Sequence, residues 1–177
     1  MDTITEYMQQ RKWAAEEKRR RIAYLTGLAQ KSRKDPDIAG KIGGMLIYNQ
    51  IIEQYLADIV EMSIYYIKAA IWPESVCLDV DLDKATFGKV IEDFRQYATI
   101  EENRELILSH LKKFNTKRNQ VVHDLFDIQD LRQLSRELDE YAKLADEILA
   151  LLENYSNAVQ RNFCQLRDLK DFCHCGQ

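Results

Sequence analysis

An apolar repeat with alternating steps of three and four residues runs through the last part of this chain and constrains its fold more than any other feature. The members of the repeat are Leu131, Leu134, Leu138, Tyr141, Ala145, Ile148, Leu152, Tyr155, Val159, Asn162, Leu166 and Leu169. Such spacing is a heptad seam, which indicates one long helix packed along one side. A helix of about 40 residues spans roughly 60 Å. Because a compact bundle needs less, we expect part of it to pack against the N-terminal helix or a second subunit.

The rest of the sequence also favours helices. Only 6 Gly and 2 Pro occur in 177 residues, so few turns are available. Pro36 and Pro73 each end a helical segment, and Asp37 is expected to cap the helix that follows Pro36. Further helices are expected at about 2–34, 38–72, 84–98 and 102–126. The predicted fold is all-α, an antiparallel up-and-down helical bundle with long N-terminal and C-terminal helices.

These helices divide the chain into three predicted parts. Residues 1–36 form a very polar N-terminal helix, residues 37–172 form the helical bundle, and residues 173–177 form a short Cys/His tail. Hydrophobic residues make up 46% of the chain and charged residues 31%, which is typical of a globular protein. The length allows a core to be buried without metal or disulfide support.

The sequence also predicts the compartment. The polar start has no apolar segment typical of a secretory signal. The most apolar stretch, 42–72, contains Glu53, Asp58, Glu61 and Lys68, so we interpret it as a buried helix and expect no membrane partner. We expect a cytoplasmic protein with reduced thiols. Its net charge of −4 disfavours a surface that binds nucleic acid throughout, but it allows a local basic patch.

One arginine breaks the apolar pattern of the helix expected at 102–126. The apolar side chains that cluster on one side of this helix are Ile107, Leu111, Phe114, Val121, Val122 and Leu125. Arg118 falls at the centre of that cluster. No acidic residue lies three or four positions away, which excludes an ordinary intrahelical ion pair. Either Arg118 belongs to a functional site, or its stem packs on the core while its charged head reaches solvent.

Polar residues around Arg118 are suited to phosphate chemistry. Asn119 and His123 are four residues apart and therefore share a helical face. Histidine transfers protons near neutral pH, and Asp127, four residues further on, is placed to orient it. With Arg118, the following residues form a local basic footprint expected to bind a substrate's phosphates: Lys112, Lys113 and Lys117.

The segment from Arg118 to His123, Arg-Asn-Gln-Val-Val-His, resembles the R-N-x-x-x-H form of the motif of HEPN domains. The preceding Thr-Phe-Gly-Lys-Val-Ile segment at 86–91 is also similar to several HEPN families, and the resemblance covers about residues 40–150. Active HEPN domains are endoribonucleases that need neither metal nor cofactor and usually act as dimers, with the two motifs meeting across the interface. The resemblance implies RNA and a second copy of the chain as partners.

Carried over to this sequence, the resemblance gives each motif residue a role. His123 acts as general base or acid on the ribose 2′-hydroxyl or the leaving 5′-oxygen. Arg118 stabilises charge on the phosphoryl group, and Asn119 orients His123 or the phosphate. The product is a 2′,3′-cyclic phosphate, and the biological role is that of a toxin, a phage-defence protein or a stress effector, with a cognate antitoxin or regulatory protein as partner.

Two other interpretations stay open. The chain is also compatible with a catalytically inactive HEPN-like regulator or partner-binding module, because its long heptad seam offers an interaction surface. It is further compatible with a plain helical scaffold in which the motif is accidental. His110, on the same helix as the motif, is expected to be structural.

Three remaining features have plain explanations. Cys164, Cys173, His174 and Cys175 suggest half a zinc site, but they lack paired C-x(2–4)-C spacing, so we expect a frayed tail. The acidic loop 73–83 lacks the glycine and final glutamate of a calcium loop. The charged run 16–21 is expected to form a salt-bridged solvent face in preference to an RNA-binding patch.

Overall fold

The computed structural model describes residues 3–34, 37–70, 85–124 and 131–174, and side chains within these ranges from residue 16 to residue 165 except those of 69 and 124. These residues form helices and short connections, with no strand in the described ranges. The helices are α1 (Thr3–Arg33), α2 (Ile38–Ala70), α3 (Phe87–Tyr97), α4 (Arg104–Asp124) and α5 (Leu131–His174). The predicted all-α helical bundle is therefore confirmed.

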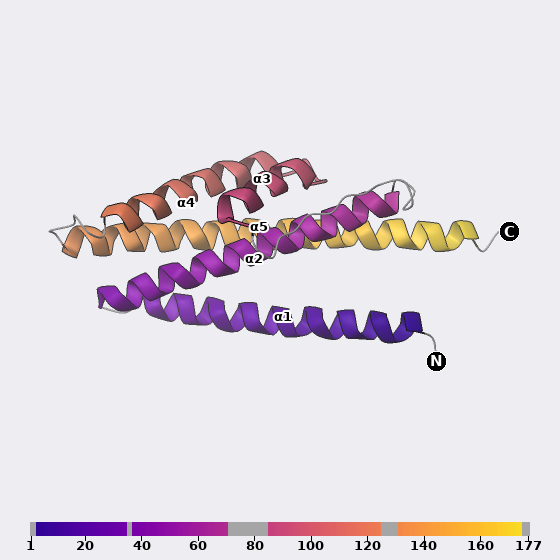
Figure 1. Cartoon of the computed structure of the whole chain (residues 1–177), viewed down its shortest axis with the longest axis horizontal. Helices are drawn as coiled ribbons and strands as arrows, with labels where there is room; N and C mark the ends of the chain where they lie inside the picture. Colours follow the sequence, from indigo (N-terminus) through magenta and orange to yellow (C-terminus); the bar gives the residue numbers. More distant parts are fainter. Residues whose placement is uncertain (1–2, 35–36, 71–84, 125–130, 175–177) are drawn as a thin grey trace.

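The long helices alternate in direction along the molecule (Figure 1). α1 and α4 run one way, while α2 and α5 run the other way, which is the predicted up-and-down arrangement. α2 crosses α5 in the middle of the molecule and makes the most extensive contact in the bundle with it. α1 packs on α2, α4 packs on α5, and the short α3 lies between α2 and α4. α2 and α5 are therefore the central pair, which the other helices cover.

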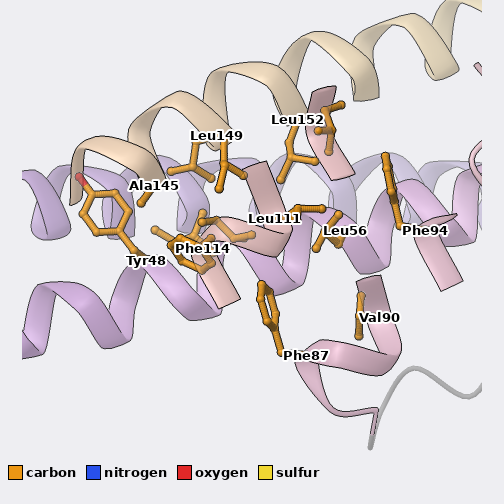
Figure 2. Close-up of a cluster of buried hydrophobic side chains, with 14 of the residues drawn as sticks. Tyr48, Leu56, Phe87, Val90, Phe94, Leu111, Phe114, Ala145, Leu149 and Leu152 are labelled. Atoms are coloured by element: carbon orange, nitrogen blue, oxygen red, sulfur yellow. The ribbon is translucent and has the colours of Figure 1, made fainter. Parts of the chain in front are cut away.

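Side chains from α2, α3, α4 and α5 meet in one apolar core (Figure 2). α5 contributes the most buried apolar side chains, and α2 follows it, in line with the nearly all-round apolar sequence of α2. The residues labelled in Figure 2 are Tyr48, Leu56, Phe87, Val90, Phe94, Leu111, Phe114, Ala145, Leu149 and Leu152. From α3, Phe87 contacts Phe114 of α4, the helix that carries the predicted motif, and Phe94 contacts Tyr155 of α5.

The heptad seam of α5 is buried from Leu134 to Val159. Leu131, at the start of the seam, is 64% exposed, and Asn162 is exposed as well. The buried part packs mainly on α2 and α4, whereas α5 touches α1 at few places. The expectation that part of this helix packs against the N-terminal helix is confirmed by the contacts of Arg19 with Gln160 and of Arg33 with Asp146, although α2 and α4 fill most of the seam. Packing against a second subunit stays a prediction.

Local signals set the helix starts. Asp37 caps α2, since the Ala39 amide donates to Asp37 Oδ1 at 3.3 Å. Thr86 caps α3 in the same way, with the Lys89 amide 3.4 Å from Thr86 Oγ1. Asn103, just before α4, has a φ of 64°, a left-handed conformation that asparagine tolerates better than most residues.

Polar side chains fasten α1 to the bundle. Lys18 forms an ion pair with Asp58 of α2, and Arg19 Nη2 lies 3.0 Å from Gln160 Oε1 of α5. These contacts agree with a salt-bridged role for the charged run 16–21, although Arg20 and Arg21 are exposed. The predicted boundary at residue 36 stays a prediction. Within the described ranges, no helix has the length and apolar character needed to cross a membrane.

Candidate functional site

Arg118 takes a position in the packing seam of α4. The seam's buried members are Ile107, Leu111, Phe114 and Val121, and Arg118 fills the step between the last two. The predicted stripe was wrong for Val122, which is 45% exposed. The seam follows a 3.5-residue period that selects Val121, and the next residue lies about 100° further round the helix.

One aromatic ring, which is the first of three rings in contact, lies against the Arg118 guanidinium. The Arg118 guanidinium carbon lies 5.7 Å from the centroid of the Phe87 ring, within range of a cation–π interaction. Phe87 contacts Phe114 with centroids 5.8 Å apart, and Phe114 contacts Tyr141 with centroids 4.5 Å apart. Arg118 is half-buried, so its guanidinium lies near the Phe87 ring while part of the side chain stays accessible.

A buried hydrogen bond lies beneath this aromatic group. The Tyr141 hydroxyl donates to Asn49 Oδ1 at 2.6 Å, which joins α5 to α2. Burial raises the pKa of Tyr141 well above its ordinary value, whereas the nearby Arg118 charge and the Asn49 hydrogen bond act in the opposite direction. Tyr141 therefore stays a neutral hydroxyl near neutral pH and serves as a rigid support for the Arg118 region.

No carboxylate within the described ranges forms an ion pair or a hydrogen bond with Arg118. Ion pairs elsewhere in the bundle satisfy neighbouring cations, as Glu140 of α5 does for Lys117. A guanidinium carries five N–H donors in a planar fork that matches a phosphate group. Arg118 thus combines a fixed position with donors that no described acid occupies.

Asn119 and His123 lie on the neighbouring, exposed face of α4. Neither side chain forms a hydrogen bond with another described residue, and Asp127, which was expected to orient His123, lies outside the described residues. Arg118 and His123 are five residues apart, or about 140° around a straight helix. A single copy of α4 therefore directs the two side chains away from each other.

A hollow next to the motif does not include the motif residues. It lies between α4 and α5, has a volume of about 290 Å³, and is lined by Lys117, Gln120, Val121, Gln133, Arg136, Glu137 and Glu140. Its acidic and basic side chains are balanced, so it offers no excess of positive charge to a phosphate. One chain alone thus presents Arg118, Asn119 and His123 on an open surface.

The predicted phosphate-binding lysines differ in availability. Lys112 and Lys113 are exposed. Lys117 is engaged by Glu140, and this hydrogen bond lowers the pKa of the Glu140 carboxyl. The two partners are 23 positions apart and on different helices, so no local spacing rule could have paired them.

His110 has the structural environment that was expected of it. Its Nδ1 lies 2.9 Å from the Leu106 carbonyl oxygen, one helical turn earlier, and its Nε2 lies 3.8 Å from Glu147 Oε2. This histidine links α4 to α5 and is half-buried. It provides a natural control for His123, because both lie on the same helix.

No protein family, curated protein or solved structure matches this chain. Membership of the HEPN family therefore stays a prediction that depends on the motif. Among the described residues, no group of three or more His, Cys, Asp and Glu side chains is placed to hold a metal ion.

Several sequence interpretations concern residues outside this description. These are the acidic loop 73–83, Cys175, and the side chains of Cys173 and His174. α5 continues to His174, so Cys173 and His174 belong to its last turn, and the frayed tail stays a prediction. Cys164 is a half-buried free thiol on α5.

Proposed function

We propose that this chain is a HEPN-type, metal-independent endoribonuclease that acts as a homodimer. The observation that carries the proposal is Arg118, a guanidinium set into the packing seam of α4, held over Phe87 and bound by no described carboxylate. Such a departure from the apolar pattern is typical of functional sites. Asn119 and His123 follow on the adjacent exposed face, with Lys112 and Lys113 exposed nearer the start of the same helix.

The proposed reaction is transfer of an RNA phosphoryl group within the substrate. His123 removes the proton from a ribose 2′-hydroxyl, and O2′ attacks the adjacent phosphorus. The bond to the 5′-oxygen breaks, and that oxygen leaves with a proton supplied by a general acid. Arg118 binds two non-bridging oxygens and stabilises the charge that develops on them, while Asn119 orients the phosphate or His123. A 2′,3′-cyclic phosphate is released with a 5′-hydroxyl.

The geometry of α4 favours a site made by two chains. Because Arg118 and His123 diverge on one helix, a second copy is needed to bring a histidine opposite an arginine. Two exposed apolar side chains lie near the motif: Val122 next to His123, and Leu131, 64% exposed, at the start of α5. The end of α4 and the start of α5 lie at the same end of the bundle (Figure 1). These two side chains are available for apolar contacts with a second copy.

The test measures cleavage of a labelled single-stranded RNA in EDTA by wild type, His123→Ala and the matched control His110→Gln. We expect the first variant to lose about a hundredfold or more of the rate, as removal of a general acid or base does, with unchanged thermal unfolding. The control should keep its activity, and wild-type product should carry a 2′,3′-cyclic phosphate. Full activity of His123→Ala would refute the assigned role.

A second candidate is a non-catalytic HEPN-like module that binds a partner, such as an antitoxin or another regulatory protein. The contact of Arg118 with Phe87 favours it, because this packing gives the arginine a structural use. The absence of the motif residues from the neighbouring hollow points the same way. This candidate predicts no RNA cleavage by wild type and loss of self-association in Arg118→Met.

A further inference from the structure

A second hollow lies on the opposite side of the bundle from the motif helix, between α1, α2 and α5. Its volume is about 770 Å³, within the range of small-molecule sites. The end of α1, the start of α2 and the first half of α5 form its walls. Its charged lining residues are Arg33, Lys34, Lys41, Asp139, Lys143 and Asp146.

The hollow is positively charged, although the protein as a whole is negative. Four cations and two carboxylates line it, a balance of +2 in a chain with a net charge of −4. Neither Lys34 nor Lys143 forms an ion pair with another described residue, and both are exposed. These two lysines therefore carry the excess charge.

The two carboxylates are already occupied by the protein itself. Asp139 accepts from Lys41 Nζ through both oxygens, at 2.8 and 2.9 Å. Asp146 accepts from Arg33 Nη1 at 2.9 Å through one oxygen and from the Tyr48 hydroxyl at 2.7 Å through the other. Because these bonds join three helices, the acidic groups are held in place and their charge is compensated within the wall.

The N–H donors that these hydrogen bonds do not use are suited to binding an anion. Arg33 donates to Asp146 through Nη1, and its other N–H groups stay available. Lys34, in the turn just after α1, and Lys143 of α5 contribute ammonium groups. No aromatic side chain lines the hollow among the described residues, so stacking of a base contributes nothing to recognition. The wall therefore offers charged groups, and no aromatic ring, to a ligand.

We propose that this hollow binds a small anion carrying two or more phosphate groups, recognised through its oligophosphate part. The volume exceeds what a single phosphate fills, and the cations come from three different helices, which suits an extended anion. Because ion pairs within the wall already hold its side chains in place, fewer side chains lose conformational freedom when the anion binds. The site involves no residue of the Arg118 motif and does not depend on RNA cleavage.

The test is titration calorimetry of the full chain in EDTA at physiological salt, with tripolyphosphate, ATP and adenosine as probes. We expect tripolyphosphate and ATP to bind with similar affinity and adenosine not to bind. The variant Lys34→Gln/Lys143→Gln should bind tripolyphosphate at least about tenfold more weakly, because it loses two charge-assisted contacts. The matched control Arg20→Gln/Arg21→Gln removes the same charge from exposed positions of α1 outside the hollow and should stay near wild type.

Three outcomes would overturn the proposal. The first is failure of wild type to bind tripolyphosphate or ATP up to millimolar concentration. The second is equal weakening of binding in both double variants, which would indicate a non-specific charge effect. Binding of a single-stranded oligonucleotide that depends on Lys34 and Lys143, without binding of either small probe, would assign the hollow to RNA instead. RNA cleavage by the two double variants is measured in parallel, which distinguishes failure of the anion-site proposal from failure of the ribonuclease proposal.

Discussion

Replacing Phe87 by leucine removes the ring on which the Arg118 guanidinium rests while it keeps an apolar side chain in the core. Phe87 is only 5% exposed and also contacts Phe114. The substitution alone should destabilise the protein by about 1–3 kcal/mol through altered packing and the lost aromatic pair. The cation–π share is smaller, about 0.5–1 kcal/mol, because Arg118 is only half-buried.

A double-mutant cycle isolates that share. Urea unfolding of wild type, Phe87→Leu, Arg118→Met and the double variant gives a coupling energy in which the general packing loss cancels. Phe94 provides the control, since it is buried on the same helix but contacts Tyr155. We expect a coupling of about 0.5–1 kcal/mol for Phe87 with Arg118 and within about 0.3 kcal/mol of zero for Phe94 with Arg118.

The same substitution probes the proposed site without deleting a reacting group. If Phe87 fixes the direction of Arg118, its loss should lower kcat for RNA cleavage by about tenfold or more through misplacement of the guanidinium. Phe94→Leu should leave kcat near wild type at a temperature where both variants are folded. Equal coupling energies for the two phenylalanines would refute the argument that the Phe87 ring supports Arg118.

Two further predictions concern the central pair of helices. Leu152→Ala should lower the free energy of unfolding by about 2–5 kcal/mol, because this side chain is fully buried. Leu131 is 64% exposed, so Leu131→Ala should change the free energy of unfolding by less than about 0.5 kcal/mol. Equal urea midpoints for the two variants would contradict the assignment of the buried seam. Burial, and then the hydrogen bond to Asp146, raise the pKa of Tyr48 above its ordinary 10.0. The contribution of the neutral Tyr48 hydroxyl to stability is therefore complete below about pH 10 and lost as the pH rises further. The free energy of unfolding, measured with urea, should fall less steeply at alkaline pH for Tyr48→Phe than for wild type. Identical pH profiles would contradict this prediction.

The candidate site could be predicted only in part. Helical spacing alone put Arg118 on the packing side of its helix, because that depends on angles within one helix. The same spacing included Val122, which proves to be 45% exposed, because the exact rotation of α4 is set by the helices that it packs on. The ring beneath Arg118 comes from Phe87, 31 positions earlier, and no local rule connects the two.

By itself, the sequence determined the number and type of the described helices and most of their ends. Heptad spacing specified α5, scarcity of glycine and proline excluded a strand-rich fold, and Asp37 marked the start of α2. These signals are local, since a helix satisfies its backbone within a few residues of itself. Tertiary structure alone decided that the α5 seam is filled by α2 and α4, that Glu140 occupies Lys117, and that Arg33 meets Asp146 across 113 positions. Those pairings depend on how whole helices are rotated and placed, and packing sets that over the entire core at once.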